Sequence, residues 1–241
     1  GNITHDPAAI SVAGPISIYG GIVTLNANLT STANGDIFIK SNTNVNGAAS
    51  IAGNASILKT GGTGTLTMQS QDRLNSGTIT ASGSGVLNVI LWSDFDNNNN
   101  GGVASGNITT NGGHLWLGGS NSNGGNYTWN GLTVGDGPSV GSGNNNHNAI
   151  DFVGAISTNG GDVLVWGGDG YSGGAFGIGV YAGAAINSGS GDITLIADNI
   201  LFNDLTLTST GLLSLVPNGG AFGASVTWSG AITTGTFNGT N

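Results

Sequence analysis

The chain has 241 residues, of which 47 are Gly and none is Cys, and it carries a formal net charge of −9. Its only basic residues are Lys40, Lys59 and Arg73. This charge argues against nucleic acid and anionic membranes as partners, because both are bound through clustered Lys and Arg. No run of 18 apolar residues is present, so we expect no membrane insertion.

The composition favours strands and turns over helices. All 12 acidic residues are Asp, and the straight-chain residues that favour helices are scarce. Gly, Asn, Ser and Thr dominate, with Val, Ile and Leu between them, which is typical of strands joined by tight turns. The 37% of hydrophobic residues argues against disorder. We therefore expect an all-β protein forming a single domain over residues 1–241.

The first 12 residues, "GNITHDPAAISV", precede the first regular repeat. They begin without a basic and apolar leader, so we expect the chain to be a processed or excised piece of something longer. A short β-prone segment of this kind is also a candidate strand for donation to a neighbouring copy.

From there a phrase recurs in which a Gly-rich turn leads into a short strand. The residue that opens each strand is Asp36, Thr65, Val86, His114, Asp162, Asp192 or Leu212. The intervals are 29, 21, 28, 48, 30 and 20 residues, and most fit one solenoid coil of roughly 20–30 residues. The interval of 48 indicates a coil plus one long Asn/Gly-rich insertion, at about residues 120–149.

Within each strand the hydrophobic pattern has a period of two. Ile37 and Ile39 flank Phe38, Leu115 and Leu117 flank Trp116, and Val163 and Val165 flank Leu164. One face is therefore buried and the other turned outward, and stacking of like positions buries the apolar row. The pattern predicts a right-handed parallel β-helix. An antiparallel β-sandwich is the main alternative, but the phrase recurs in one polarity, which favours the solenoid.

A smaller loop, at about residues 93–106, interrupts the repeat. Its sequence "DFDNNNNGG" places Asp94, Asp96, Asn98 and Asn100 at alternating positions, as in the first ligands of an EF-hand loop. The sixth position, normally Gly, is Asn99, which tolerates positive φ. Calcium is thus a candidate ligand, although the chain has no Glu to close the loop. The alternative is a solvated Asn-rich turn.

The outward positions of the central strands are unusually apolar. Trp92, Trp116, Leu164 and Trp166 would form an aromatic contact patch on three consecutive rungs, and an exposed patch of this kind is usually covered by something. One interpretation is intramolecular: the insertion carries Tyr127, Trp129, Leu132 and Val134 and could fold back over the patch. The others are contact with another protomer and an aromatic platform for sugar rings.

Catalytic patterns are lacking, so we expect a protein that is not an enzyme. No Cys nucleophile, His-x-x-x-His or phosphate-binding loop occurs, and we read His114 as a surface variant of the position held by Asp162 and Asp192. Paired Thr residues such as Thr65/Thr67 are too often interrupted along the chain for an ice-binding array.

The phrases "ITTNGGHLWLGGS", "ISTNGGDVLVWGGD" and "SGSGDITLIAD" resemble the repeat regions of filamentous-haemagglutinin-like secreted bacterial exoproteins. The resemblance implies a parallel β-helix that serves as a shaft segment of an extracellular or cell-surface fibre. It implies a role in adhesion, biofilm matrix or sheath, with partners that are further copies of the chain or surface glycans. No cofactor is required by this interpretation.

Overall fold

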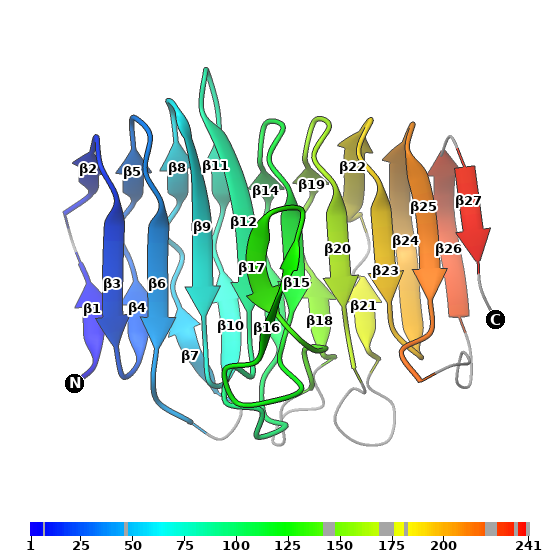
Figure 1. Ribbon diagram of the computed structural model, residues 1–241, viewed down its shortest axis with the longest axis horizontal. Coiled ribbons are helices and arrows are strands. Elements are labelled where there is room, and N and C mark those ends of the chain that lie inside the picture. The colour runs from blue at the N-terminus through cyan, green and yellow to red at the C-terminus, as the bar shows by residue number, and fades with distance from the viewer. Residues whose placement is uncertain are drawn as a thin grey trace.

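A computed structural model describes residues 1–6, 8–45, 48–141, 148–168, 176–180, 183–219, 226–233 and 236–239. It confirms the all-β prediction: every element is a strand, and nearly all strands pair in parallel with the equivalent strand of the next coil. No helix long and apolar enough to cross a membrane occurs among these residues. The strands form three stacked faces and one separate hairpin (Figure 1).

The first face and the second face belong to one 16-stranded sheet. The first face contains β1 (Ile3–His5), β4 (Val23–Leu25), β7 (Ala49–Ala52), β10 (Arg73–Ser76), β13 (Val103–Ser105), β18 (Ile150–Phe152) and β21 (Ile178–Val180). The second face contains β2 (Ile10–Val12), β5 (Leu29–Ser31), β8 (Ile57–Lys59), β11 (Ile79–Ala81), β14 (Ile108–Thr109), β19 (Ile156–Ser157) and β22 (Ala185–Gly189). Both faces join through the long strand β24 (Ile200–Ser209), which β26 (Val226–Thr233) follows in parallel.

The third face is a parallel sheet of nine strands. They are β3 (Ile16–Gly20), β6 (Ile37–Ser41), β9 (Thr63–Gln69), β12 (Val86–Trp92), β15 (Leu115–Gly118), β20 (Val163–Trp166), β23 (Ile193–Ile196), β25 (Leu212–Val216) and β27 (Thr236–Gly239). In Figure 1 this face lies in front with its strands running downward, the other faces run upward behind it, and the chain advances from left to right. That sense of winding is right-handed, as predicted.

The core fills the tube between the three faces. Inward residues of successive coils stack in register, so that Ile37, Leu66, Val89, Leu115 and Val163 form one buried row. Each of these side chains is at most 1% exposed. Since a single strand cannot bury its own apolar side, stacking of coils is the main source of stability.

β12 begins at Val86, as predicted, but the register corrects the coil intervals on either side of it. Asn88, and not Val86, stands level with Thr65 and His114. The reason is that β12 begins two residues before that level, with Val86 paired to Thr63. The coil lengths around Asn88 are therefore 23 and 26 residues in place of 21 and 28.

The first 12 residues are also placed differently from the prediction. β1 pairs with β4, and β2 pairs with β5, so this segment forms two sides of the first coil. It is therefore not an unpaired strand available for donation.

Candidate functional site

The insertion contains a β-hairpin of β16 (Asn126–Trp129) and β17 (Leu132–Gly135). Its turn is Asn130-Gly131, with φ of 47° and 76°. Positive φ at both central residues is the requirement of a type I′ turn, which Asn-Gly meets better than other pairs. The flanking sequence "YTW" and "LTV" alternates, which gives the hairpin one apolar side. Figure 1 shows the hairpin lying in front of the third face.

The apolar side of the hairpin covers the predicted contact patch. Trp92 is 2% exposed, Trp116 0% and Leu164 8%, and they form with Ile90 and Val134 a second apolar cluster separate from the core. Tyr127, Trp129 and Leu132 of the hairpin pack against this cluster. The prediction that Trp92, Trp116 and Leu164 point outward is confirmed, and so is the prediction that the insertion folds back over them.

The same burial corrects the contact-patch prediction. Trp92, Trp116 and Leu164 are not available to a sugar or another protomer, because the hairpin occupies their outer side. Trp166 stays partly exposed and donates its indole N–H to Asn218 Oδ1 at 2.7 Å. Trp92 donates its indole N–H to Ser120 Oγ at 2.8 Å and meets Trp116 edge to face, with ring centroids 6.2 Å apart.

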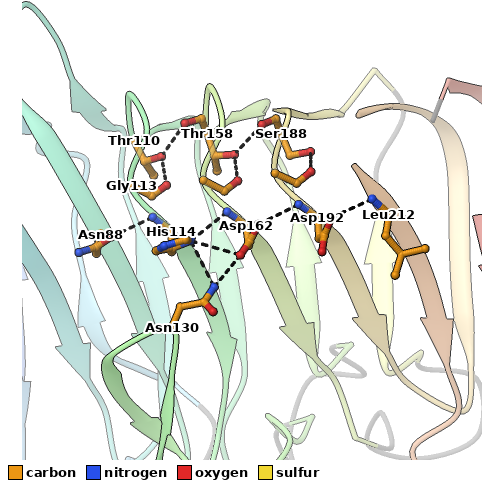
Figure 2. Close-up of polar contacts among 12 residues, drawn as sticks. Asn88, Thr110, Gly113, His114, Asn130, Thr158, Asp162, Ser188, Asp192 and Leu212 are labelled. Atoms are coloured by element: carbon orange, nitrogen blue, oxygen red, sulfur yellow. Dashed lines mark hydrogen bonds and ion pairs between the residues drawn. The ribbon is translucent and has the colours of Figure 1, made fainter. Parts of the chain in front are cut away.

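Four residues that stand level with one another on the third face share a structural role: Asn88, His114, Asp162 and Asp192. The side chain of each accepts a hydrogen bond from the backbone N–H of the equivalent residue in the next coil (Figure 2). The distances are 2.9 Å from His114 N to Asn88 Oδ1, 3.0 Å from Asp162 N to His114 Nδ1, and 2.8 Å from Asp192 N to Asp162 Oδ1. This side-chain ladder satisfies backbone donors at a corner where the sheet hydrogen bonds are interrupted.

His114 is therefore a ladder residue. Its Nδ1 accepts the Asp162 N–H and so takes the place of a carboxylate or amide oxygen. A second row, of hydroxyl groups, lies beside it: Thr110, Thr158 and Ser188 each donate to the carbonyl of the Gly three residues on (Figure 2).

The tip of the hairpin is fixed to this ladder. Asn130 Nδ2 donates to Asp162 Oδ2 at 2.7 Å and lies 3.3 Å from His114 Nδ1 (Figure 2). The His114 ring meets Trp129 edge to face, with centroids 5.7 Å apart. The hairpin is thus held by apolar packing beneath it and by a polar contact at its tip.

The Asp/Asn loop lies beside the insertion. Asn97 Nδ2 donates to Asn121 O at 2.8 Å, and Gly124 N donates to Phe95 O at 2.9 Å. Phe95 packs against Trp92, with ring centroids 5.2 Å apart, and Lys40 Nζ lies 3.8 Å from the centroid of the Phe95 ring. Through Phe95 the loop therefore contacts Trp92, in the hairpin-covered part of the third face, and Lys40, in the uncovered part.

The predicted calcium ligands lie in this loop, and two of their carboxylate oxygens have no hydrogen-bond partner. Asp94 is 0% exposed; its Oδ1 accepts the Asn98 N–H at 2.9 Å, and its Oδ2 is buried without a hydrogen-bond partner. Asp96 Oδ1 is likewise buried without a partner, and Asp96 Oδ2 accepts Asn98 Nδ2 at 3.0 Å. Asn99 has φ of 60°, as expected for the sixth position. Asn100 Nδ2 donates to Asn44 Oδ1 at 3.4 Å.

The raised pKa values of Asp94 and Asp96 show that burial disfavours their charged forms, which a bound cation would stabilise. Burial raises the pKa of Asp94 to about 7, against opposing hydrogen bonds from the Asn98, Asn99 and Asn100 backbone. Burial also raises the pKa of Asp96, and the charge of Asp72 adds to the effect. Among the described residues, however, no group of three or more Asp or His side chains is arranged to hold a metal ion. A cation here would have two carboxylates and would need amide or backbone oxygens for the rest.

Comparison with known proteins adds no assignment: no family model, no curated protein and no solved structure matches the chain.

The hairpin could have been found from the sequence. "NG" between two alternating apolar runs, as in "YTWNGLTV", is the strongest short-range signal for a hairpin.

Proposed function

We propose that the chain is a structural segment of a secreted bacterial surface adhesin or of an extracellular matrix or sheath fibre. The observation that carries the proposal is the unbroken parallel ladder of the third face, nine strands deep. Hydrogen bonds along the axis and a continuous core make such a stack a stiff rod, suited to spanning distance and not to changing shape. The resemblance of the repeated phrases to filamentous-haemagglutinin-like exoproteins supports the same role.

The surface chemistry agrees with an extracellular rod. The ladder side chains and hydroxyl rows bond to backbone donors and carbonyls, so they stabilise the coil. We assign the chain no catalytic role and propose that it acts outside the cell. A hydrated surface rich in Asn, Ser and Thr is compatible with adhesion or matrix formation there.

The first coil supports end-to-end assembly as part of this function. Among the described residues, β1, β2 and β3 pair on one side only, with β4, β5 and β6. Ile3 is 39% exposed, and Ile10, Val12 and Ile18 are only partly buried against the core. In the isolated 241-residue chain, such a parallel edge above a partly covered core is a template for another coil, which is the form of the chain tested below.

Electron microscopy of the purified chain, and of native material where it can be obtained, tests the proposal. We expect fibres whose axis follows the coil stack. A Ser11→Pro variant should block them: Ile10 N donates to Asn28 O of the neighbouring coil, so the alternating Ser11 N–H points to the open edge. An Ile3→Lys variant should act likewise. Val153→Lys, at a residue 64% exposed on the side of the rod, is the matched control and should still assemble. Discrete monomers at every concentration would contradict end-to-end assembly.

A further inference from the structure

The third face has an uncovered part beside the hairpin, and two aromatic rings lie on it. Tyr19 of β3 is 59% exposed, and Phe38 of β6 is half-buried. Their ring centroids are 5.3 Å apart with an interplanar angle of 34°. Tyr19 stands level with Lys40 and Phe38 level with Ser17, so the two rings are diagonal neighbours on adjacent rungs. They form a continuous aromatic surface that faces outward.

The hairpin converts this surface into a depression. Leu132 and Thr133 of β17 form one wall, Tyr19 and Phe38 lie across from it, and Thr65 and Thr67 of β9 lie between. The depression has a volume of about 450 Å³. That volume lies at the lower end of the range for small-molecule sites, which combine apolar walls with a few polar groups. The hairpin therefore has two effects: it buries one aromatic cluster and makes a wall for another.

The charge of the depression limits its ligands. Asp36 is the one carboxylate among its lining residues, and no lining residue is cationic. Asp36 Oδ1 accepts the Thr65 N–H at 2.8 Å, which holds this carboxylate in place. The nearest basic side chain on the same strand, Lys40, lies over the Phe95 ring. A phosphate, sulfate or uronic acid would meet negative charge without a cation to balance it.

We infer that this depression binds a neutral saccharide of one or two hexose units. A pyranose presents one face of C–H groups, which carry partial positive charge and suit the negative face of an aromatic ring such as Tyr19. Its edge carries hydroxyls, which can bond to the Thr65 and Thr67 hydroxyls and to the Asp36 carboxylate. Leu132 contacts the remaining apolar surface. This site borders the buried cluster through Ile90 and Leu132 but does not include Trp92 or Trp116, and it does not depend on whether the chain forms fibres.

The site is shallow and solvent-facing, so weak binding is expected, with Kd of roughly 0.1–10 mM for a single saccharide. Assembly into a fibre would repeat the site along the rod, and multivalent attachment to a glycan surface would then raise the apparent affinity. A weak site per copy is therefore adequate for adhesion.

The test is ligand-observed NMR and calorimetry on the full chain with lactose, cellobiose, maltose and N,N′-diacetylchitobiose as probes. We expect at least one of these to bind and galacturonic acid not to bind. Tyr19→Ala should weaken the binding at least about 10-fold, Tyr19→Phe should keep most of it, and Thr67→Val should weaken it several-fold. Val153→Ala is the surface control. Thermal melts establish that each variant is folded, as expected for changes at the exposed positions 19 and 153 and the half-buried position 67.

Three results would overturn the inference: no binding of any of the four probes at about 10 mM, roughly the weak limit stated above; binding that Tyr19→Ala leaves unchanged; or preferential binding of galacturonic acid. Binding of an extended peptide in place of saccharides would also overturn it, and would point to the strand edge of β17, which pairs with β16 on one side only.

Discussion

Two parts of the third face differ in whether their outward side chains are covered by the hairpin. In β12, β15 and β20 the outward residues Ile90, Trp92, Trp116 and Leu164 are large and apolar and lie buried beneath the hairpin. In β3, β6 and β9 the outward row also holds aromatic residues, Tyr19 and Phe38, yet these are open to solvent or half-buried. The backbone ladder is the same in both parts, with the same parallel register. The outward row can therefore change its chemistry from coil to coil without altering the fold.

In a solenoid of this kind, function can reside in the outward row. The inward row must remain apolar because each side chain packs against the same position in two neighbouring coils. Outward positions have no such constraint, and an insertion from one coil can bury some of them and shape others. Five predictions probe this boundary between the covered and the open part.

Truncating the centre of the covered cluster should have the largest effect. Trp116→Ala removes a ring that is 0% exposed and leaves a cavity beneath the hairpin. We expect a loss of about 3–5 kcal/mol in the free energy of unfolding, measured by urea denaturation. Tyr19→Ala, in the open part, should cost about 0.5 kcal/mol or less. An equal loss of unfolding free energy in the two variants would contradict the burial of Trp116 beneath the hairpin.

The Asp/Asn loop, which joins the two parts, should make stability depend on pH. The pKa of Asp94 is raised to about 7 by burial, whereas the unfolded chain releases this proton near the ordinary value of 3.8. Between these values the folded state holds the Asp94 proton more tightly, so the stability that this group contributes is fully present below about pH 4 and is lost as pH rises to about 7. Asp94→Asn should flatten the change in melting temperature between pH 4 and pH 8, and Asp6→Asn, at an exposed carboxyl, should not.

The same loop gives the calcium test. Calcium would favour the ionised carboxylates of Asp94 and Asp96, so it should raise the melting temperature most above pH 7. Chelation should reverse the gain, and magnesium should not restore it, because two carboxylates with amide oxygens suit the longer and more flexible calcium coordination. Asp94→Asn should abolish the response. A melt that is indifferent to calcium and to chelator would leave the loop as an Asn-rich turn.

The coil architecture was predictable because its signals are local and repeated. The period of two at Ile37–Ile39 and Val163–Val165, with a Gly turn before each strand, predicts both the buried row and the parallel stacking. Coil boundaries were harder to predict. Val86 is the first residue of β12, as the sequence suggests, but only its pairing with Thr63 shows that β12 starts two residues before the level of Asn88.

The outward residues were harder to interpret because their environment is set by a distant segment. The sequence shows that Trp92, Trp116 and Leu164 point away from the core, but burial depends on where the hairpin lies. The role of His114 was hidden for a similar reason. Its Nδ1 replaces an Asp oxygen in a ladder between coils 48 residues apart along the chain, and such a contact leaves no signal in the neighbouring sequence.

The contact at the hairpin tip should contribute less than the packing beneath it. Asn130→Gly keeps a residue suited to positive φ but removes the hydrogen bond to Asp162 Oδ2. We expect a loss of about 1–2 kcal/mol, since the bond is made to a charged group. Hydrogen exchange of the β16 and β17 amides should accelerate, while that of the core strands should not. Thr128→Ala, exposed on the same hairpin, serves as control. Unchanged exchange would show that packing alone holds the hairpin.

The smallest effect is expected where one ladder residue replaces another. His114→Asn introduces the residue type that stands one coil earlier, at Asn88, and its amide oxygen can accept the Asp162 N–H in place of Nδ1. The free energy of unfolding at pH 7 should change by about 0.5 kcal/mol or less. His114→Leu offers no acceptor and leaves the Asp162 N–H without its partner, which should cost about 1–3 kcal/mol. The ladder assignment requires these two variants to differ. If they destabilise the protein equally, the contribution of His114 comes from its ring contact with Trp129 and not from Nδ1 as an acceptor.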